Sequence, residues 1–392
     1  MRQAFNMHIE FNYRYYEDEN QSKDYHLIME ECLDSAIAYH LDEVGEVVNF
    51  AENEQQKGRY VALYMTYEAA PYFNDKMSVN IIEENQILAV AYSFKDVRHN
   101  KENASASHNR KLNSTKQKHH FKFHESDDVM MRKIKLIQQA IVEGHTYQVN
   151  YTTRLYSAIH FPITALYDKL TAHQNGHYTA LLDTPEIQVA SISPELFFQK
   201  GDFKEHDNVI LSKPMKGTMP RGRSIEEDEQ LYYALKHSAK DRAENVMIVD
   251  LLRNDITRIS QSGTINVDQP FMIECYDTVF QMTSMVSGQL KPQTNLVDIM
   301  RALFPCGSIT GAPKLSTMKY IQQLETSPRS IYCGTIGVLL PDGRMIFNIP
   351  IRTIEYRNQE AIYGVGAGIT IDSIPENEVQ GFHDKTKILE NL

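Results

Sequence analysis

The chain of 392 residues carries a formal net charge of −11, and 42% of its residues are hydrophobic. This length allows two or three domains or one large fused unit, and the hydrophobic fraction is ample for a sizeable core. A protein that binds nucleic acid usually presents a basic face. Only one short basic run occurs, Lys116 to His120, so the composition argues against nucleic acid as a partner.

Cysteine usage and the amino terminus bear on the compartment. The four cysteines lie far apart and include no CxxC pair, which fits free thiols in a reducing cytosol. The amino terminus lacks the apolar core of a signal peptide, and no run of about 18 apolar residues occurs that would span a membrane. We therefore expect a cytoplasmic protein with no membrane association.

Residues 1–95 are expected to form an amino-terminal α+β part that packs on the core. Apolar residues at helical spacing favour a helix from Tyr25 to His40, and two apolar runs, Tyr60 to Tyr67 and Gln86 to Phe94, predict strands. Residues 96–128 are polar and charge-mixed, and such a segment buries too little apolar surface to offset its ordering entropy. We interpret them as a polar linker or mobile loop.

Residues 129–392 are dense with predicted structure and form the third part. The predicted helices are Met130 to Glu143, Ser224 to about Leu252, Asn295 to Phe304 and Ala312 to Leu324. The predicted strands are Val149 to Tyr156, Ile187 to Ser193, Ile331 to Leu340, Met345 to Tyr356 and Ala361 to Ile371. A turn at Pro341 to Gly343 favours antiparallel pairing. Helices and strands do not alternate strictly, so an α+β fold is favoured over a doubly wound parallel sheet.

Several common site motifs fail on inspection. GVGAGI, from Gly364 to Ile369, lacks the third glycine of a dinucleotide fingerprint, and GSITGAPK, from Gly307 to Lys314, has the wrong glycine spacing for a phosphate loop. No Cys/His set has zinc spacing. No GxSxG or GxCxG nucleophile elbow occurs, so the chain is not expected to make ammonia from glutamine by that route.

One lysine lies on a constrained turn in the segment PMKGTMPRG, from Pro214 to Gly222. A free lysine amine is almost fully protonated at neutral pH, so a nucleophilic lysine needs burial or a nearby cation. Lys213 and Arg221 are available as such cations for Lys216. From the residues alone, a surface lysine in a turn stays open as the alternative.

Two further patterns suggest sites for ions. Asp241 and Glu244 stand three residues apart, so on a helix both carboxylates share a face and suit magnesium. Pairing with the neighbouring Lys240 and Arg242 is the simpler alternative. Arg352 lies in an apolar run, where a buried guanidinium needs an anion such as a carboxylate, and a structural salt bridge remains equally open.

From about Val129 to Leu392 the chain resembles the chorismate-utilising enzymes. This family comprises anthranilate synthase component I, aminodeoxychorismate synthase component I, and isochorismate and salicylate synthases. The matching segments are YQVNYT, SISPELFF, PMKGTMPRG, AKDRAENVMIVDLLRND, FPCGSITGAPK, YCGTIG, IPIRT and GVGAGITIDS. The resemblance implies large, mainly antiparallel sheets packed as a sandwich flanked by helices, as in anthranilate synthase component I. It also implies that residues 129–392 form a chorismate-binding catalytic domain.

Two positions select a branch of this family. Isochorismate and salicylate synthases carry a water-activating lysine where this chain has Gln148, and anthranilate synthases carry alanine where it has Lys216. Both residues favour the aminodeoxychorismate synthases, which the segment YVALYMTYEAAPYF also resembles. The resemblance thus implies amination of chorismate at C4 by ammonia to give 4-amino-4-deoxychorismate, for 4-aminobenzoate and folate synthesis. The ammonia is expected to come from a separate glutamine amidotransferase subunit.

The family mechanism implies a role for each matching residue. Lys216 is the covalent nucleophile, Glu195 is the general acid, and a magnesium ion is held by Glu244 with Asp241 beside it. Glu378 is a further candidate ligand of the metal. The residues implied in substrate binding are Gly217, Thr218, Thr310, Tyr332, Arg352, Gly366, Ala367, Gly368 and Lys385.

Two departures from the family pattern leave alternatives. A histidine of the family is Gln281 here, and a magnesium-binding glutamate aligns with Gly381, for which Glu376 or Glu378 is a candidate replacement. One alternative is an anthranilate synthase component I, which Lys216 argues against. The other is a catalytically weakened chorismate-binding subunit.

Overall fold

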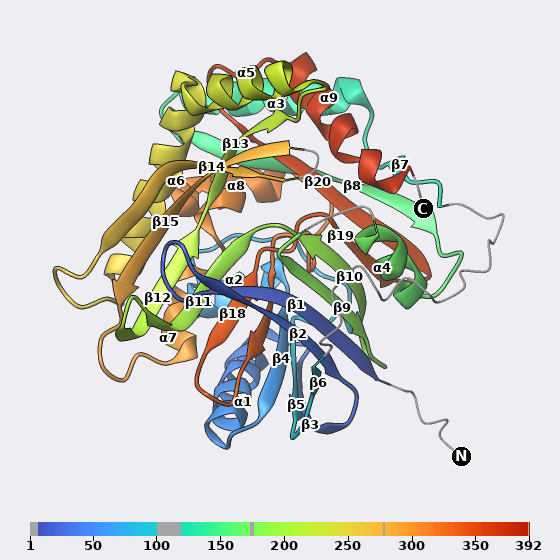
Figure 1. The fold of residues 1–392 in the computed structure, drawn as a ribbon. Coiled ribbons are helices and arrows are strands. Elements are labelled where there is room, and N and C mark those ends of the chain that lie inside the picture. The colour runs from blue at the N-terminus through green and yellow to red at the C-terminus, as the bar shows by residue number, and fades with distance from the viewer. Residues whose placement is uncertain (1–6, 100–118, 173–175, 277–278, 391) are drawn as a thin grey trace.

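Two antiparallel sheets, each of ten strands, lie face to face in the computed structural model (Figure 1). The structure describes residues 7–99, 119–172, 176–276, 279–390 and 392. Most of the predicted linker, residues 100–118, therefore lies outside the described residues. The expected α+β architecture of two antiparallel sheets is confirmed.

The first sheet gathers strands from both ends of the chain. Its order is β16-β8-β20-β19-β10-β9-β1-β2-β6, with β7 also paired to β8. In that order the strands are Gly311–Ala312, Gln148–Ala158, Glu360–Ile369, Thr353–Arg357, Gln188–Ser193, Tyr178–Asp183, His8–Tyr16, Ser22–Met29 and Arg98–His99, and β7 is Lys122–Phe123.

The second sheet has the order β13-β15-β12-β11-β18-β17-β4-β5-β3, with β14 paired to β15. In that order the strands are Met215–Pro220, Val279–Gln289, His206–Lys213, Leu196–Phe203, Met345–Asn348, Thr335–Leu339, Tyr60–Met65, Ala89–Phe94 and Cys32–Ala38, and β14 is Asn266–Cys275. The β17–β18 hairpin turns at Pro341 to Gly343, as predicted.

Helices cover the outer faces of both sheets. On the second sheet lie α1 (Val44–Gln56), α2 (Ala70–Phe73), α5 (Ile225–Lys236), α6 (Ala239–Thr257) and α7 (Leu296–Leu303). On the first lie α3 (Asp127–Val142), α4 (Ile163–Thr171), α8 (Lys314–Leu324) and α9 (Pro375–Lys385). Short 3-10 turns are Leu41–Glu43, Tyr67–Ala69, Gly307–Ile309 and Lys387–Leu389. Within the described residues, no helix is long and apolar enough to cross a membrane.

The core follows from the alternation of side chains along each strand. Between the sheets, Phe11 and Leu27 of the first sheet join Val90 and Ile336 of the second in one buried cluster. Because successive side chains of a strand point to opposite faces, Tyr363, Val365 and the other odd-numbered residues of β20 pack outward under the helices of the first sheet. The even-numbered residues of β20 therefore face the second sheet.

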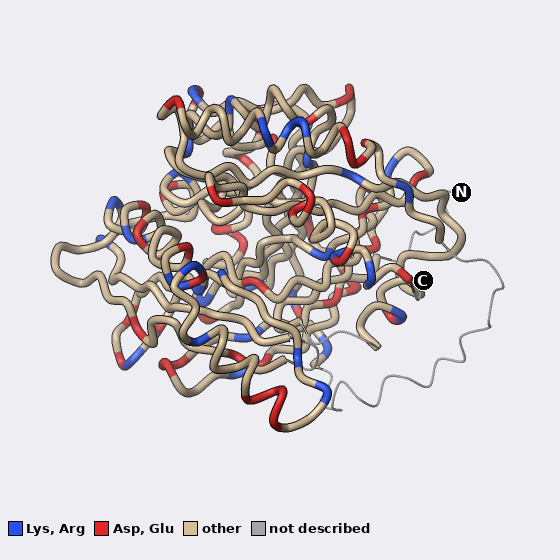
Figure 2. Tube along the Cα trace, turned by 90° about the horizontal axis from the view of Figure 1, so that it is seen from above, with Lys and Arg blue, Asp and Glu red and all other residues tan. Residues whose placement is uncertain are grey.

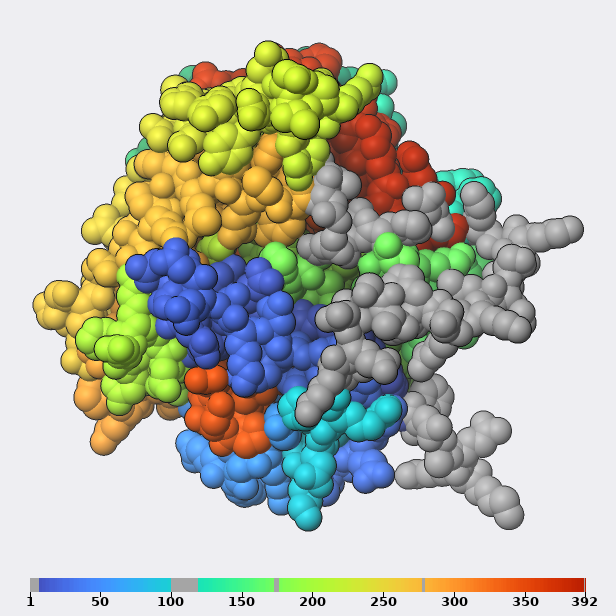
Figure 3. All heavy atoms as spheres, in the orientation of Figure 1, coloured from blue at the N-terminus to red at the C-terminus, as the bar shows by residue number. Residues whose placement is uncertain are grey.

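The amino-terminal strands are part of both sheets. β1 pairs with β9, and β4 pairs with β17. On the surface, the amino-terminal residues lie against segments from the middle and the end of the chain (Figure 3). Seen from above, acidic and basic residues are interspersed along the chain (Figure 2).

Three predicted elements were wrong or incomplete. The expected helix from Tyr25 to His40 is instead the two strands β2 and β3, which belong to different sheets. The alternate residues Tyr25, Leu27 and Met29 are the buried face of β2. The expected strand from Met345 to Tyr356 is split into β18 and β19, which belong to different sheets. The expected helix from Ser224 to Leu252 is broken before Ser238, whose side chain accepts a hydrogen bond from the Asp241 N–H and caps α6.

A buried ionic network ties the amino-terminal part to the later chain. The Glu68 carboxylate accepts the backbone N–H groups of Arg329 (2.7 Å) and Ser330 (2.9 Å). The Arg329 guanidinium makes a bidentate pair with Glu325 at 2.9 and 2.6 Å. Burial raises the pKa of Glu68 to about 7. A buried pair of this kind costs most when only one partner is removed, because the other charge is left without compensation.

We predict that Arg329→Met lowers the free energy of unfolding by about 3–5 kcal/mol, because Glu325 would remain buried without its partner. The matched control is Arg301→Met, which removes a half-exposed pair with Asp298 and should cost less than about 1 kcal/mol. Urea unfolding followed by circular dichroism compares the two variants. Equal midpoints would contradict the importance of the buried network.

Candidate active site

Lys216 lies where the edges of the two sheets approach each other. It stands on β13, the edge strand of the second sheet, and its side chain reaches toward Gly368 on β20 of the first. A methyl group added to Gly368 would lie 3.4 Å from Lys216 Nζ. The next residue, Gly217, has a φ of +99° and packs against Asp241. The expected turn is thus an irregularity within β13, between Met215 and Thr218, whose backbone requires glycine at Gly217.

The side-chain amide of Gln148 also meets Gly368. A methyl group at Gly368 would clash with Gln148 Nε2, so glycine is needed for this close approach. Gln148 is buried, and its Oε1 has no hydrogen-bond partner. A buried acceptor without a partner is costly, and the Gln148 side chain shares the space above Gly368 with the Lys216 amine.

Glu195 is a buried acid on the connection between β10 and β11. Its Oε1 accepts a hydrogen bond from Ser308 Oγ at 3.1 Å, and its backbone N–H donates to Ser193 Oγ. Burial raises the pKa of this carboxyl to about 7, against the lowering effects of Lys216, Ser308 and the Met215 N–H. A carboxyl with this pKa is suited to give and take a proton near neutrality.

The three predicted metal residues come from two helices. Asp241 and Glu244 lie in the first turns of α6, and Glu378 lies on α9. Burial raises the pKa of Glu244, with further contributions from Asp241 and Glu378, against Lys216 and Lys240. Among the described residues, no three His, Cys, Asp or Glu side chains form a ready set of metal ligands. Magnesium typically uses one or two carboxylates together with waters and substrate oxygens, and the mutual repulsion of these carboxylates suits a divalent cation.

Of two further predicted cations, Lys385 interacts with Lys216, and Arg352 interacts with Lys385. Lys385, on α9, donates a hydrogen bond from Nζ to the Gly366 carbonyl. Lys385 is an exposed residue, yet desolvation of its amine lowers its pKa to about 8, with Lys216 as a contributing like charge. Arg352 lies in the break between β18 and β19 with a φ of +50°, rather than within a strand as expected. Its charge also acts on Lys385.

Tyr332 contacts β20 at Gly364, two residues before Gly366. Its ring lies against Gly364, where a side chain would collide with it. The Arg154 guanidinium stacks 5.0 Å from the centre of the same ring. Tyr332 is thus held on the inner face of β20, two residues from Gly366.

Three predicted substrate residues direct their side chains elsewhere. The Thr218 hydroxyl donates to Gln281 Oε1 at 2.9 Å, and the buried Thr310 hydroxyl donates to the Cys306 carbonyl at 3.0 Å. Ala367 packs on the helix side of the first sheet, which leaves only its backbone on the inner face.

The two cations proposed from sequence to activate Lys216 are engaged with other partners. Lys213 Nζ donates to Tyr16 Oη and Glu274. Arg221 makes a bidentate pair with Asp228 at 2.8 and 2.7 Å. That expectation was therefore wrong, and Lys385 is the lysine whose charge interacts with Lys216.

Sequence reasoning missed two neighbours of the site. Ser308 donates to Glu195, and it stands in the matching segment FPCGSITGAPK, which was the available signal. Lys240 acts on the Glu244 carboxylate, but its position beside Asp241 in sequence suggested an ion pair instead. Among the described residues, Lys240 makes no ion pair with Asp241.

Comparison with curated proteins finds relatives in two branches of one family. The chain is 38% identical over 253 residues to aminodeoxychorismate synthase component 1 of Bacillus subtilis, covering 64% of this chain and 53% of that protein. It is 37% identical over 261 residues to anthranilate synthase component 1 1 of Haloarcula marismortui, covering 66% and 52%. The chain thus spans about half the length of the curated relatives it matches.

Solved structures share the fold along the whole chain. Anthranilate synthase component I from Streptococcus pneumoniae superposes with a TM-score of 0.75 at 21% identity, covering 100% of this chain and 93% of that one. A putative 2,3-dihydroxybenzoate-specific isochorismate synthase from Bacillus anthracis gives 0.75 at 18% identity, covering 99% and 96%. The expected anthranilate synthase component I-like fold is confirmed. A family model described as chorismate binding enzyme matches residues 12–391, so the chain belongs to the chorismate binding enzymes.

Proposed function

We propose that this chain aminates chorismate at C4 to give 4-amino-4-deoxychorismate, with Lys216 as a covalent nucleophile. The observation that carries the proposal is the position of the Lys216 amine. It lies beside Gly368 and acts electrostatically on Glu195, Glu244 and Lys385. Lys216 therefore lies near the acid Glu195, near Lys385, which suits a substrate carboxylate, and near Glu244, which suits a metal ion.

The reaction would proceed by two allylic displacements. The neutral amine of Lys216 attacks C2 of chorismate, the ring double bond shifts, and the C4–O bond breaks. Ammonia then attacks C4, the double bond shifts back, and the C2–N bond to Lys216 breaks. Each step is easier than one direct substitution at C4, which is the usual advantage of a covalent intermediate.

Glu195 would give its proton to the departing C4 hydroxyl, which then leaves as water. Its pKa of about 7 keeps much of the acid protonated at neutral pH. The Ser308 hydroxyl fixes the direction of the carboxyl by donating to Oε1. Lys385 and Arg352 would bind the carboxylates of chorismate, because both cations lie near β20.

Magnesium fits as the cofactor. Glu244 and Glu378 would hold it, with Asp241 beside them, and it would neutralise the ring carboxylate of the substrate. The relative from Bacillus subtilis is named component 1. In keeping with this, we propose that a separate glutamine amidotransferase subunit supplies the ammonia.

An anthranilate synthase is the second candidate, because relatives of that name match at nearly the same identity. The two reactions differ in product. Anthranilate is fluorescent, whereas 4-amino-4-deoxychorismate yields 4-aminobenzoate only after a lyase is added. Incubation with chorismate, magnesium and ammonium therefore separates them, and the lone chain should be inactive when glutamine replaces ammonium.

We predict that Lys216→Ala abolishes amination, because no other amine would occupy the position beside Gly368. Intact-mass spectrometry of the wild-type chain quenched with chorismate should reveal an adduct on the peptide that contains Lys216. Lys319→Ala, which removes an exposed lysine of α8, is the matched control and should retain both adduct and activity. Full amination by Lys216→Ala in the presence of ammonium, with no other amine added, would remove Lys216 from the mechanism.

We predict that Glu195→Gln lowers kcat by about 10²–10⁴-fold, since a general acid contributes on that scale. In the wild-type chain, the rate should fall as the pH rises through about 7, because the raised pKa of Glu195 is the point above which the carboxyl loses its proton. This alkaline limb should be absent from the pH profile of Glu195→Gln. An unchanged limb in the variant would assign it to another group.

We predict that Gly381→Glu strengthens magnesium binding by about tenfold, or ~1.4 kcal/mol. Gly381 is three residues after Glu378 and four before Lys385, so the three share a helix face, and a Cβ at Gly381 meets nothing within 4 Å. Calorimetric titration with magnesium measures the change without an activity assay. Gln380→Glu adds the same charge on another face of α9 and should leave affinity nearly unchanged. Equal affinities in both variants would place Gly381 outside the metal site.

A further inference from the structure

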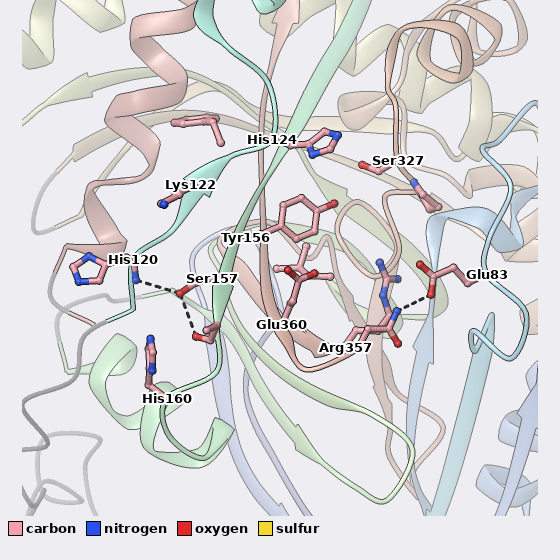
Figure 4. A pocket seen from close by; sticks show the side chains of 15 residues that line it. Glu83, His120, Lys122, His124, Tyr156, Ser157, His160, Ser327, Arg357 and Glu360 are labelled. Carbon is pink, nitrogen blue, oxygen red and sulfur yellow. Dashed lines mark hydrogen bonds between the residues drawn. The ribbon is translucent and has the colours of Figure 1, made fainter.

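A second hollow opens at the other end of the strands that build the candidate active site. It has a volume of about 790 Å³ and is lined by β7, β8, the β19–β20 turn and the loop before β17 (Figure 4). Glu360 and Ile362 of β20 line it, whereas Gly366 and Gly368 of the same strand face the candidate active site. At about 3.3 Å per residue, six residues of β20 separate Ile362 from Gly368 by roughly 20 Å.

A stacked pair stands between the two sites on this face. Gly364 pairs with Arg154 across β20 and β8, and the Arg154 guanidinium stacks on the Tyr332 ring. Arg154 is buried, and two of its nitrogens, Nε and Nη2, have no hydrogen-bond partner. Arg154 Nη2 lies 3.8 Å from the Glu325 carboxylate, and Arg154 does not line the hollow. The stacked pair therefore separates the hollow from the Lys216 site.

The lining of the hollow includes a guanidinium, that of Arg357, whose donors are not all hydrogen-bonded. Arg357 lines the hollow, and its Nε and Nη1 are buried without a hydrogen-bond partner. The nearby Glu355 carboxylate accepts hydrogen bonds from Tyr64 and Ser330 instead. Donors of a buried cation that lack partners are costly, and the positive charge of Arg357 at the wall of the hollow favours an anion there.

Further positive or protonatable groups face the same space. Lys122 of β7 and the imidazoles of His120, His124 and His160 line it (Figure 4). Of the two lining carboxylates, Glu83 accepts a hydrogen bond from Asn358 at 2.6 Å. The other lining carboxylate, Glu360, lies beside Tyr156 (Figure 4). Since no three His, Cys, Asp or Glu residues among those described form a metal-ligand set, the histidines here do not constitute a metal site.

The hollow also has an apolar component. Tyr156 stands in its centre with the His124 ring 5.7 Å away, and Ile362, Phe123 and Pro328 contribute further apolar surface. A volume of 300–1,000 Å³ is typical of sites for small organic ligands. A bare inorganic ion would leave most of this space unfilled.

We propose that this hollow is a second binding site, which takes a small organic anion with a flat apolar body and one carboxylate or phosphate group. The anionic group binds at Arg357 and Lys122, and the body lies against Tyr156 and Ile362. The proposal concerns binding alone, and it stands whether or not Lys216 is the nucleophile.

Three probes with the same ring test the proposal by calorimetric titration of the full chain. Benzoate and phenyl phosphate present the two anionic groups, and benzyl alcohol presents none. At least one of the two anions should bind at millimolar concentrations with a tenfold or greater advantage over benzyl alcohol, about 1.4 kcal/mol. The stronger of the two identifies the anionic group that the site prefers. Equal binding of benzyl alcohol, or no binding of either anion, would overturn the proposal.

Variants locate the site. Arg357→Gln should weaken binding of the anion about tenfold or more. Because that change leaves buried Glu355 without its nearest cation, Lys122→Gln on exposed β7 provides an independent variant with the same expected direction. Arg352→Gln, at the chorismate site, should retain the binding. Loss of binding in Arg352→Gln with retention in Lys122→Gln would assign the anion to the chorismate site and refute a second one.

Discussion

The close approach of Lys216 to Gly368 is the constraint on which the candidate site depends. The lysine belongs to one sheet and the glycine to the other, so their distance is set by how the two sheets pack across Phe11, Leu27 and the rest of the shared core. A side chain at Gly368 would collide with Gln148 and press on Lys216. The glycine therefore makes room for both the Gln148 amide and the Lys216 amine.

The charge of Lys216 acts on the buried carboxyl of Glu195. Burial raises the pKa of Glu195, and the positive amine limits that rise. The amine and the buried acid are therefore coupled electrostatically across the candidate site.

Local patterns predicted much of the fold, and the errors have identifiable causes. The strands β4 and β5 and the helix α3 were found because their apolar spacing matches their period. The break at Ser238 was missed because both halves of the segment are helical, and only the side-chain cap on the Asp241 N–H separates them. The division into β18 and β19 was missed because alternation is the same whichever sheet a strand joins.

For the site residues too, local sequence patterns predicted some features and missed others. Motifs identified Lys216, Glu195 and Glu244, because each lies in a segment whose resemblance covers its neighbours. Chain proximity failed for the surrounding cations, since Lys213, three residues before Lys216, turns to Glu274, and Lys385 reaches the site from the last helix. A side chain's partners depend on sheet register and helix docking, which no short segment contains. For the same reason, Arg357 drew no attention in the sequence, because only the folded chain leaves its Nε and Nη1 without hydrogen-bond partners beside a hollow.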